Sequence, residues 1–207
     1  MQTASPPLRS SPATMTQTNV DSDSQRLRAL GLAAIAFFLI HALYQQLHGR
    51  LENLLWACHL ADLAVGLGLV LASRAITATG LVMLGFGVPM WLVGLATGGE
   101  FYPTSILTHL GGTTVGILGL RRLGGLQGDW WKAYLAILLL IVLSRCLTPA
   151  AMNVNFAFRT WGFAREWIPS LEIHLLSLLA VWAAGLFAAE SVLRLLVRHN
   201  RQLANCA

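Results

Sequence analysis

The sequence predicts an all-α membrane protein, a single bundle of six transmembrane helices with both termini in the cytoplasm. Hydrophobic residues make up 56% of the chain and charged residues only 11%, whereas soluble domains carry about 25% charged residues. After residue 28 the chain divides into six apolar stretches joined by short connections. Since only helices and closed barrels satisfy their backbone groups in lipid, we expect each stretch to cross the bilayer as a helix.

The length of a spanning helix, about 20 apolar residues, places the six segments. They cover 29–47, 51–72, 76–97, 104–120, 131–150 and 170–196, and the fourth is the shortest. Residues 1–28 are rich in Ser, Thr, Pro and Gln and contain no signal-peptide core, so we expect a disordered tail. The transmembrane domain then spans 29–197, and residues 198–207 form a short cytoplasmic tail.

The distribution of basic residues predicts the orientation. The side of the N-terminus carries Arg9, Arg26, Arg28, Arg74, Arg121, Arg122, Lys132, Arg194, Arg198 and Arg201. The opposite loops carry only Arg50, Arg159 and Arg165, so the positive-inside rule places both termini in the cytoplasm. Because these cations are dispersed at helix ends, the net charge of +5 favours anchoring at anionic headgroups over nucleic-acid binding.

Polar residues inside the segments all fall toward one end of the predicted bundle. They are His41 and His48 late in the first segment, Cys58, His59 and Asp62 early in the second, His109 early in the fourth, Arg145 late in the fifth, and Glu172 and His174 early in the sixth. In an antiparallel bundle these positions share one depth. Since ionisable groups in hydrocarbon mostly line a cavity or do chemistry, we predict one polar site in the outer half of the membrane.

The second segment combines a thiol, an imidazole and a carboxylate within one helical turn. Cys58 and Asp62 are four residues apart, and His59 and Asp62 three apart, so each pair shares a face. A nearby imidazole can turn a thiol into a nucleophilic thiolate, and a carboxylate can orient that imidazole. His59 points about 100° away from Cys58, which makes His109 the better base. The alternatives are a buried apolar role for Cys58 and a helix-to-helix hydrogen bond for Asp62.

The later segments add further candidates. Thr104 or Ser105 can cap the fourth helix, and His109 follows beside two glycines that leave room for a ligand chain. Arg145, the only interior cation, can pair with Asp62, with Glu172 or with a lipid phosphate. The loop after the fifth segment reads as an amphipathic segment at the interface, with Asn153, Asn155, Phe156, Phe158, Trp161 and Phe163.

Three short motifs resemble a family. The runs CHLADL, THLGG and, after the fifth segment, NVNF are similar to motifs of the YwaF-like integral membrane proteins of bacteria. That resemblance implies a bacterial inner (plasma) membrane protein whose shared polar residues are His59, Asp62, His109 and Asn155. The family's eukaryotic relatives include a lysophospholipid acyltransferase with a membrane Cys and His, which implies Cys58 as nucleophile and His109 as base. The bacterial chains carry their cysteine where Ala61 stands here.

These observations lead to one favoured function and two alternatives. The favoured function is acyl transfer on a lipid or other amphipathic substrate, with Cys58, His109 and Asp62 as catalytic residues. Its substrate would be held by His59, Arg145, Asn155, Glu172 and His174. An ion-coupled transporter or permease would also use membrane carboxylates and histidines, but it predicts polar residues on both sides of the midplane, and the inner half looks almost bare.

The second alternative is a haem or transition-metal protein built on the histidines. We predict no metal, no cofactor and no disulfide, because close His pairs are missing and the three cysteines, Cys206 among them, form no framework.

Overall fold

The computed structural model describes residues 12–160, 167–168 and 170–204, and it is helical, with no strand among them. Its long elements are α1 (Pro12–Leu47), α2 (Ala57–Val70), α3 (Arg74–Ala96), α4 (Gly112–Arg122), α5 (Trp130–Leu147) and α6 (Leu171–Ala204). Three short turns, η1 (Leu51–Leu55), η2 (Leu107–Gly111) and η3 (Val154–Phe156), lie between them. The all-α prediction is therefore confirmed.

Within the residues that the structure describes, four helical stretches are long and apolar enough to cross a membrane. They are Ser22–Leu47, Arg74–Ala96, Trp130–Leu147 and Leu171–Val197. Helix α2 is apolar too, but its 14 residues rise only roughly 21 Å. These helices make the chain compatible with a multi-pass membrane protein, as its composition predicts.

The helix boundaries differ from the predicted ones in three places. Helix α1 already begins at Pro12, so the part of the predicted disordered tail that the structure describes is helical. The second segment is broken at Trp56, which has an extended ψ of 133° between the 3-10 turn η1 and α2. The fourth segment is helical from 105 to 122, but residues 107–111 form a π-helical turn.

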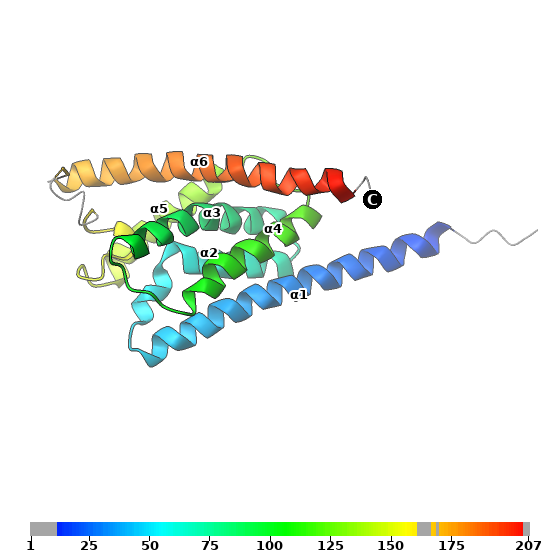
Figure 1. Ribbon diagram of the computed structural model, residues 1–207, viewed down its shortest axis with the longest axis horizontal. Coiled ribbons are helices and arrows are strands. Elements are labelled where there is room, and N and C mark those ends of the chain that lie inside the picture. The colour runs from blue at the N-terminus through cyan, green and yellow to red at the C-terminus, as the bar shows by residue number, and fades with distance from the viewer. Residues whose placement is uncertain (1–11, 161–166, 169, 205–207) are drawn as a thin grey trace, which may run out of the picture.

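Helices α1 and α6 flank the shorter helices, and the N-terminal end of α1 and the C-terminal end of α6 point to the same side (Figure 1). Glycines allow α2 to pack closely between α1 and α3. A Cβ on Gly31 would lie 2.7 Å from the Gly66 carbonyl oxygen, and one on Gly80 would lie 2.6 Å from that of Ala61. Such contacts are the close backbone approach that small residues permit between membrane helices.

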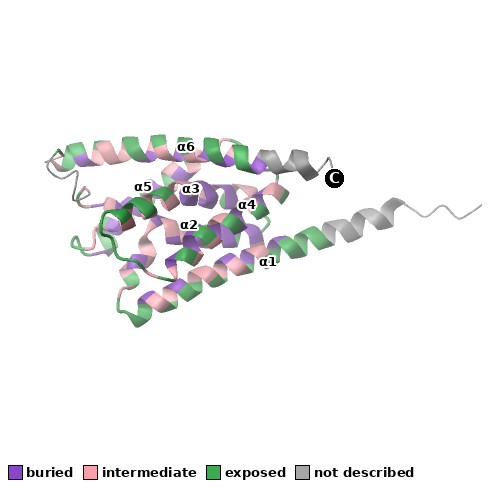
Figure 2. Ribbon diagram, in the orientation of Figure 1, coloured by how far each residue is buried: buried purple, intermediate pink, exposed green. Residues whose placement is uncertain are grey.

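Burial follows this arrangement, as Figure 2 shows. The core is centred on α2 and α3, where Val65, Leu69 and Leu81 are completely buried, and the other helices add residues to it. Large apolar side chains such as Leu43 of α1 and Leu176 of α6 are exposed on the flanking helices. In a bilayer these faces would contact lipid, so their exposure fits the composition of the chain.

At the end of the bundle where α3 begins, Asp129 is fully buried between two cations. Its carboxylate accepts hydrogen bonds from Arg74 Nη1 at 2.7 Å and from Lys132 Nζ at 2.8 Å. Burial by itself would raise the pKa of Asp129, but the hydrogen bonds from Arg74, Lys132 and the Gln127 amide lower it to about 2. The carboxylate therefore stays charged and holds α3 against the start of α5.

Glu190 of α6 completes this charged region. Its carboxylate accepts the backbone N–H groups of Gly128, Asp129 and Trp130 at 2.8, 3.1 and 2.7 Å, and Arg194 lies 2.9 Å away. A negative side chain at the first turn of α5 satisfies donors that a helix start leaves free. We call Arg74, Asp129, Lys132, Glu190 and Arg194 the charge clamp. The end of the bundle predicted to lie in the inner half was expected to be almost bare of polar groups, but Asp129 and Glu190 are both buried there.

Candidate functional site

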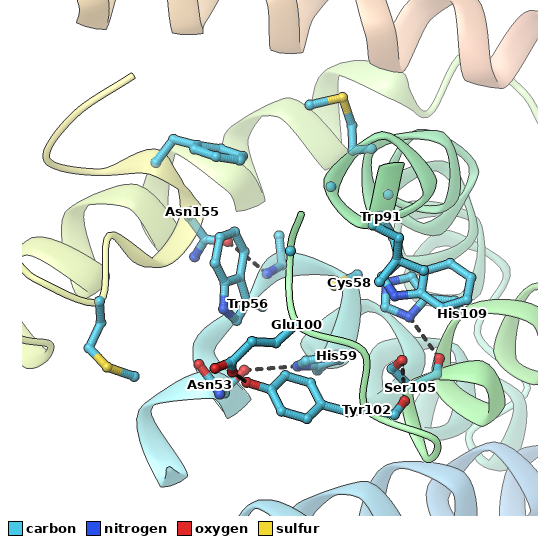
Figure 3. Close-up of a pocket in the computed structure, with 18 of the residues that line it drawn as sticks. Asn53, Trp56, Cys58, His59, Trp91, Glu100, Tyr102, Ser105, His109 and Asn155 are labelled. Atoms are coloured by element: carbon cyan, nitrogen blue, oxygen red, sulfur yellow. Dashed lines mark hydrogen bonds between the residues drawn. The ribbon is translucent and has the colours of Figure 1, made fainter. Parts of the chain in front are cut away.

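A cavity of about 880 Å³ lies at the end of the bundle opposite the charge clamp. Its wall is formed by η1, the first turn of α2, the second half of α3, η2 and the segment around η3. Met83, Met90, Trp91 and Trp182 supply apolar surface, while several predicted site residues also reach it (Figure 3). The cavity is large enough for part of a lipid chain.

Three of the predicted site residues meet in this wall. The Cys58 sulfur and one ring nitrogen each of His59 and His109 all lie within 4.8 Å of one another. The His59 and His109 ring centroids are 5.7 Å apart, and Trp91 stacks on His109 at 4.7 Å. Figure 3 shows Cys58 and His59 coming from the start of α2, with His109 and Trp91 beside them. We call Cys58, His59 and His109 the Cys-His cluster.

Backbone carbonyls determine the tautomers of the two histidines. His59 Nδ1 donates to the Asn53 carbonyl oxygen, and His109 Nδ1 donates to that of Ser105, both at 2.8 Å. In the neutral ring this leaves Nε2 with the lone pair. His109 Nε2 is buried, and within the described part of the chain it has no hydrogen-bond partner. Both rings therefore carry their lone pair on Nε2, and each has a ring nitrogen within 4.8 Å of the Cys58 sulfur.

A chain of hydrogen bonds continues from the cluster into α1. His41, whose ring centroid lies 4.1 Å from that of His59, accepts at Nε2 from Gln45 at 3.2 Å and donates from Nδ1 to Thr104 Oγ1 at 2.8 Å. Asn53 in turn donates to Gln45 Oε1 at 3.2 Å. Gln45 was not among the predicted site residues, although it lies four residues from His41 and therefore on the same helix face.

The predicted cap of the fourth helix is wrong for both candidates. The Thr104 hydroxyl is engaged by His41, and the Ser105 hydroxyl donates to the Tyr102 carbonyl oxygen at 2.6 Å. Ser105 instead contributes its carbonyl to His109, one turn away inside the widened π turn. A π turn of this kind often occurs at a functional site. The sequence contains no pattern from which the π turn could be predicted.

Asp62 is fully buried but does not line the cavity. It packs against α4, where a Cβ on Gly112 would lie only 2.2 Å from Asp62 Oδ1. Neither carboxyl oxygen has a hydrogen-bond partner among the residues that the structure describes. The expected contacts of Asp62, as orienter of an imidazole, as partner of Arg145 or as a helix-to-helix hydrogen bond, are therefore not formed.

Arg145 and His174 hold a loop instead of facing the cavity. Arg145 donates to the Ala157 carbonyl oxygen at 2.6 Å and lies over the Phe158 ring at 5.4 Å. His174 Nε2 donates to the Phe156 carbonyl oxygen at 2.8 Å. Glu172 is exposed and lies outside the cavity wall as well. None of these three predicted residues lines the cavity, because a position along a helix does not tell which way a side chain points.

Asn155 does line the cavity, and it also organises the start of α2. Its Oδ1 accepts the Ala57 N–H at 2.8 Å, while Nδ2 donates to the Leu55 carbonyl oxygen at 2.8 Å and to Ser144 Oγ at 2.9 Å. Trp56, which precedes α2, provides no side-chain cap. Asn155 therefore replaces the missing cap from a distant loop and positions the turn that carries Cys58. Its φ of 55° is one that Asn tolerates better than most residues.

A polar rim surrounds the mouth of the cavity. Arg50 forms an ion pair with Glu100 and donates to the Tyr102 hydroxyl at 2.7 Å, while Tyr102 donates to Glu100. These hydrogen bonds, first from Tyr102 and then from Arg50, lower the pKa of Glu100 below its ordinary value. The cavity thus joins a charged mouth to a largely apolar interior.

Comparison of the chain with protein-family models, with curated proteins and with solved structures finds no match. The loop residues Trp161, Phe163 and Arg165, and the tail residue Cys206, lie outside the described residues. Among the described cysteines, Cys58 and Cys146 are free thiols, and only Cys58 belongs to the cavity wall.

Proposed function

We propose that this chain is a multi-pass membrane acyltransferase that transfers an acyl chain to or from a lipid through the Cys58 thiol and the His109 imidazole. The observation that carries the proposal is the meeting of Cys58 and His109 in the wall of the cavity, with the Cys58 sulfur and a His109 ring nitrogen within 4.8 Å. The resemblance of CHLADL and THLGG to motifs of YwaF-like proteins supports the same roles.

The proposed topology has six crossings, both termini in the cytoplasm of a bacterial cell and the cavity in the outer half of the inner membrane. The common side of the N-terminal end of α1 and the C-terminal end of α6 supports an even number of crossings (Figure 1). The continuous helix over 105–122 and the sequence excess of Lys and Arg on the clamp side support it as well.

In the proposed reaction, His109 Nε2 takes the Cys58 thiol proton and the thiolate attacks the carbonyl carbon of a lipid ester. The C–S bond forms, the ester C–O bond breaks, and the imidazolium returns the proton to the leaving alcohol oxygen. An acceptor hydroxyl then gives its proton to His109 and attacks the thioester carbon, so that a C–O bond forms and the C–S bond breaks. The imidazolium returns the proton to the Cys58 sulfur, which restores the thiol. The Ser105 carbonyl, which holds His109 Nδ1, takes the orienting role that the sequence assigned to Asp62.

The cavity suits an amphipathic substrate. The acyl chain would lie against Met83, Met90 and Trp182, while a phosphate or other polar headgroup would stay near Arg50 at the mouth. The headgroup contact that the sequence assigned to Arg145 would thus fall to Arg50 at the rim, because the Arg145 guanidinium is bound to the Ala157 carbonyl oxygen of the loop.

The transporter alternative gains little from the buried carboxylates of the inner half. Asp129 and Glu190 are fully engaged by cations and backbone N–H groups, which is the expected state of structural charges. The cavity wall is drawn only from the opposite end of the bundle.

Covalent acylation of Cys58 tests the proposal. Purified, chelator-treated protein in detergent is incubated with a phospholipid carrying an alkyne-tagged acyl chain, and hydroxylamine-sensitive label is located by mass spectrometry. We expect label on Cys58 that is lost in Cys58→Ser and unchanged in Cys146→Ser, the matched thiol outside the cavity.

Loss of the base should slow the labelling about 10²-fold or more in His109→Asn. The asparagine keeps an N–H for the Ser105 carbonyl but lacks the atom that corresponds to Nε2. Absence of label on Cys58 in the wild type, or labelling that ignores His109, would refute the acyl-transfer proposal.

A further inference from the structure

We propose that Cys58, His59 and His109 form a binding site for one divalent transition-metal ion of the Zn²⁺ class. The inference goes beyond acyl transfer, because a metal can bind these atoms whether or not the thiol reacts with a lipid. It rests on the geometry of the Cys-His cluster and on the way each histidine is held.

Three atoms that can bind a metal converge in the Cys-His cluster: the Cys58 sulfur and one ring nitrogen each of His59 and His109. Zn²⁺ binds Cys sulfur at about 2.3 Å and His nitrogen at about 2.0–2.1 Å, so ligands of one tetrahedral ion lie roughly 3.3–3.6 Å apart. The three atoms here lie within 4.8 Å of one another, so an ion would have to draw them together by at most roughly 1–1.5 Å. Cys58 and His59 come from α2 and His109 from the π turn, so two separate elements would share the ion.

Backbone carbonyl groups hold both histidine rings in the way that is usual for metal-binding histidines. Metal-binding histidines almost always donate their other ring N–H to a carbonyl or carboxylate, which sets the tautomer and raises the basicity of the ligand nitrogen. His59 and His109 both do so, through Asn53 and Ser105. The free His109 Nε2 is buried without a hydrogen-bond partner in the described part of the chain. A metal ion would satisfy this atom.

The ligand set indicates the class of metal. A thiolate and two imidazoles favour Zn²⁺ and related transition metals over Mg²⁺ and Ca²⁺, which prefer oxygen. Three protein ligands with a side open to a cavity are typical of sites that leave a fourth position for water or substrate. Because the ion would occupy both the Cys58 sulfur and His109 Nε2, metal binding and acylation of Cys58 should exclude each other.

Cobalt spectroscopy tests the site without any lipid. The full chain is purified in detergent, treated with a chelator and titrated with Co²⁺, whose thiolate complexes give a charge-transfer band in the near ultraviolet. We expect one Co²⁺ per chain, intense visible bands of a tetrahedral ion, the thiolate band, and displacement of Co²⁺ by one equivalent of Zn²⁺.

The variants are matched in their hydrogen bonds. His59→Asn keeps an N–H for the Asn53 carbonyl but removes the ligand nitrogen, whereas His48→Asn changes an exposed histidine that donates in the same way to the Tyr44 carbonyl at 2.7 Å. We expect His59→Asn to lose affinity for Co²⁺ by about 10²-fold or more, Cys58→Ser to lose the thiolate band, and His48→Asn to behave as the wild type.

A second readout needs no variant. Zn²⁺ should protect Cys58 of the wild type from alkylation by N-ethylmaleimide, while Mg²⁺ should not, and Cys146 should react equally in both. Wild-type Co²⁺ spectra without a thiolate band, together with alkylation of Cys58 that ignores Zn²⁺, would overturn the proposal. Since metal binding is measured without lipid and acylation on chelator-treated protein, either proposal can fail while the other stands.

Discussion

The two ends of the bundle each contain a buried aspartate, and the two aspartates differ in their hydrogen-bond partners. Asp129 at the charge clamp is surrounded by Arg74, Lys132 and a backbone amide, whereas Asp62 near the cavity has no hydrogen-bond partner among the described residues. A buried polar group without partners costs roughly 1–3 kcal/mol. The clamp therefore has the character of a structural joint, whereas the cavity end keeps, in Asp62 and His109, buried polar atoms that form no stabilising hydrogen bond with the described residues.

The same contrast holds for the other polar groups. Glu190 uses its carboxylate to hold the first residues of α5, while His109 leaves a ring nitrogen free beside a thiol. Free acceptors within a membrane protein are expected where a ligand or a reaction uses them. Substitutions can test whether the two ends differ in stability as this comparison requires.

The largest effect is expected from Glu190→Ala. The substitution leaves three backbone N–H groups at the start of α5 and the Arg194 guanidinium without their acceptor. We expect a loss of about 3–5 kcal/mol in the free energy of unfolding, measured by sodium dodecyl sulfate titration in mixed micelles. Glu172→Ala, at an exposed position, should change it by less than about 0.5 kcal/mol. Equal losses for the two variants would contradict the clamp.

A smaller loss is expected from Gly112→Ala, which tests the contact between α2 and α4. The added methyl group would lie 2.2 Å from Asp62 Oδ1, and such overpacking costs about 1–3 kcal/mol. Asp62→Ala in the same chain should recover most of this loss. Gly119→Ala, which meets Leu69 at the same 2.2 Å, serves as the control that Asp62→Ala should not rescue.

The pH dependence of stability should reveal the charge on Asp129. Its folded pKa is about 2 against an ordinary value of 3.8, so its ion pairs stabilise the protein above about pH 4 and are lost as the pH falls toward 2. The difference in thermal midpoint between the wild type and Asp129→Asn should be constant from pH 7 to 5 and shrink at lower pH. A difference that persists at pH 2 would mean that the charge is not what stabilises the clamp.

The smallest effect is expected from Asp62→Asn, the counterpart of Asp129→Asn at the other end. Because Asp62 has no cation or donor in the described structure, the neutral isostere should change the free energy of unfolding by less than about 1 kcal/mol. A loss as large as that of Asp129→Asn would show that Asp62 has a stabilising partner, and the contrast between the two ends would fail.

The meeting of three histidines at the cavity end could be predicted from the sequence, because the position of a residue along an apolar segment indicates its level in a helical bundle. His41 comes late in the first segment, while His59 and His109 come early in the second and fourth, so an antiparallel bundle predicts a common level for them, and the rings do meet. The sequence could not show that Trp91 stacks on His109, since an aromatic residue near a helix end has the same pattern when it simply lies at the interface.

The sequence by itself determined that the chain is helical, that several of its helices are apolar enough to cross a membrane and that His41, His59 and His109 gather at one end of the bundle. These features depend on composition and on runs of apolar residues. Only the tertiary structure decided which of the polar groups face one another. Arg145 and His174 turn toward loop carbonyls, and Glu190 binds backbone N–H groups about sixty residues away. Backbone acceptors and donors are present at every position, so a side-chain pattern carries no information about which of them a long-range fold will bring close.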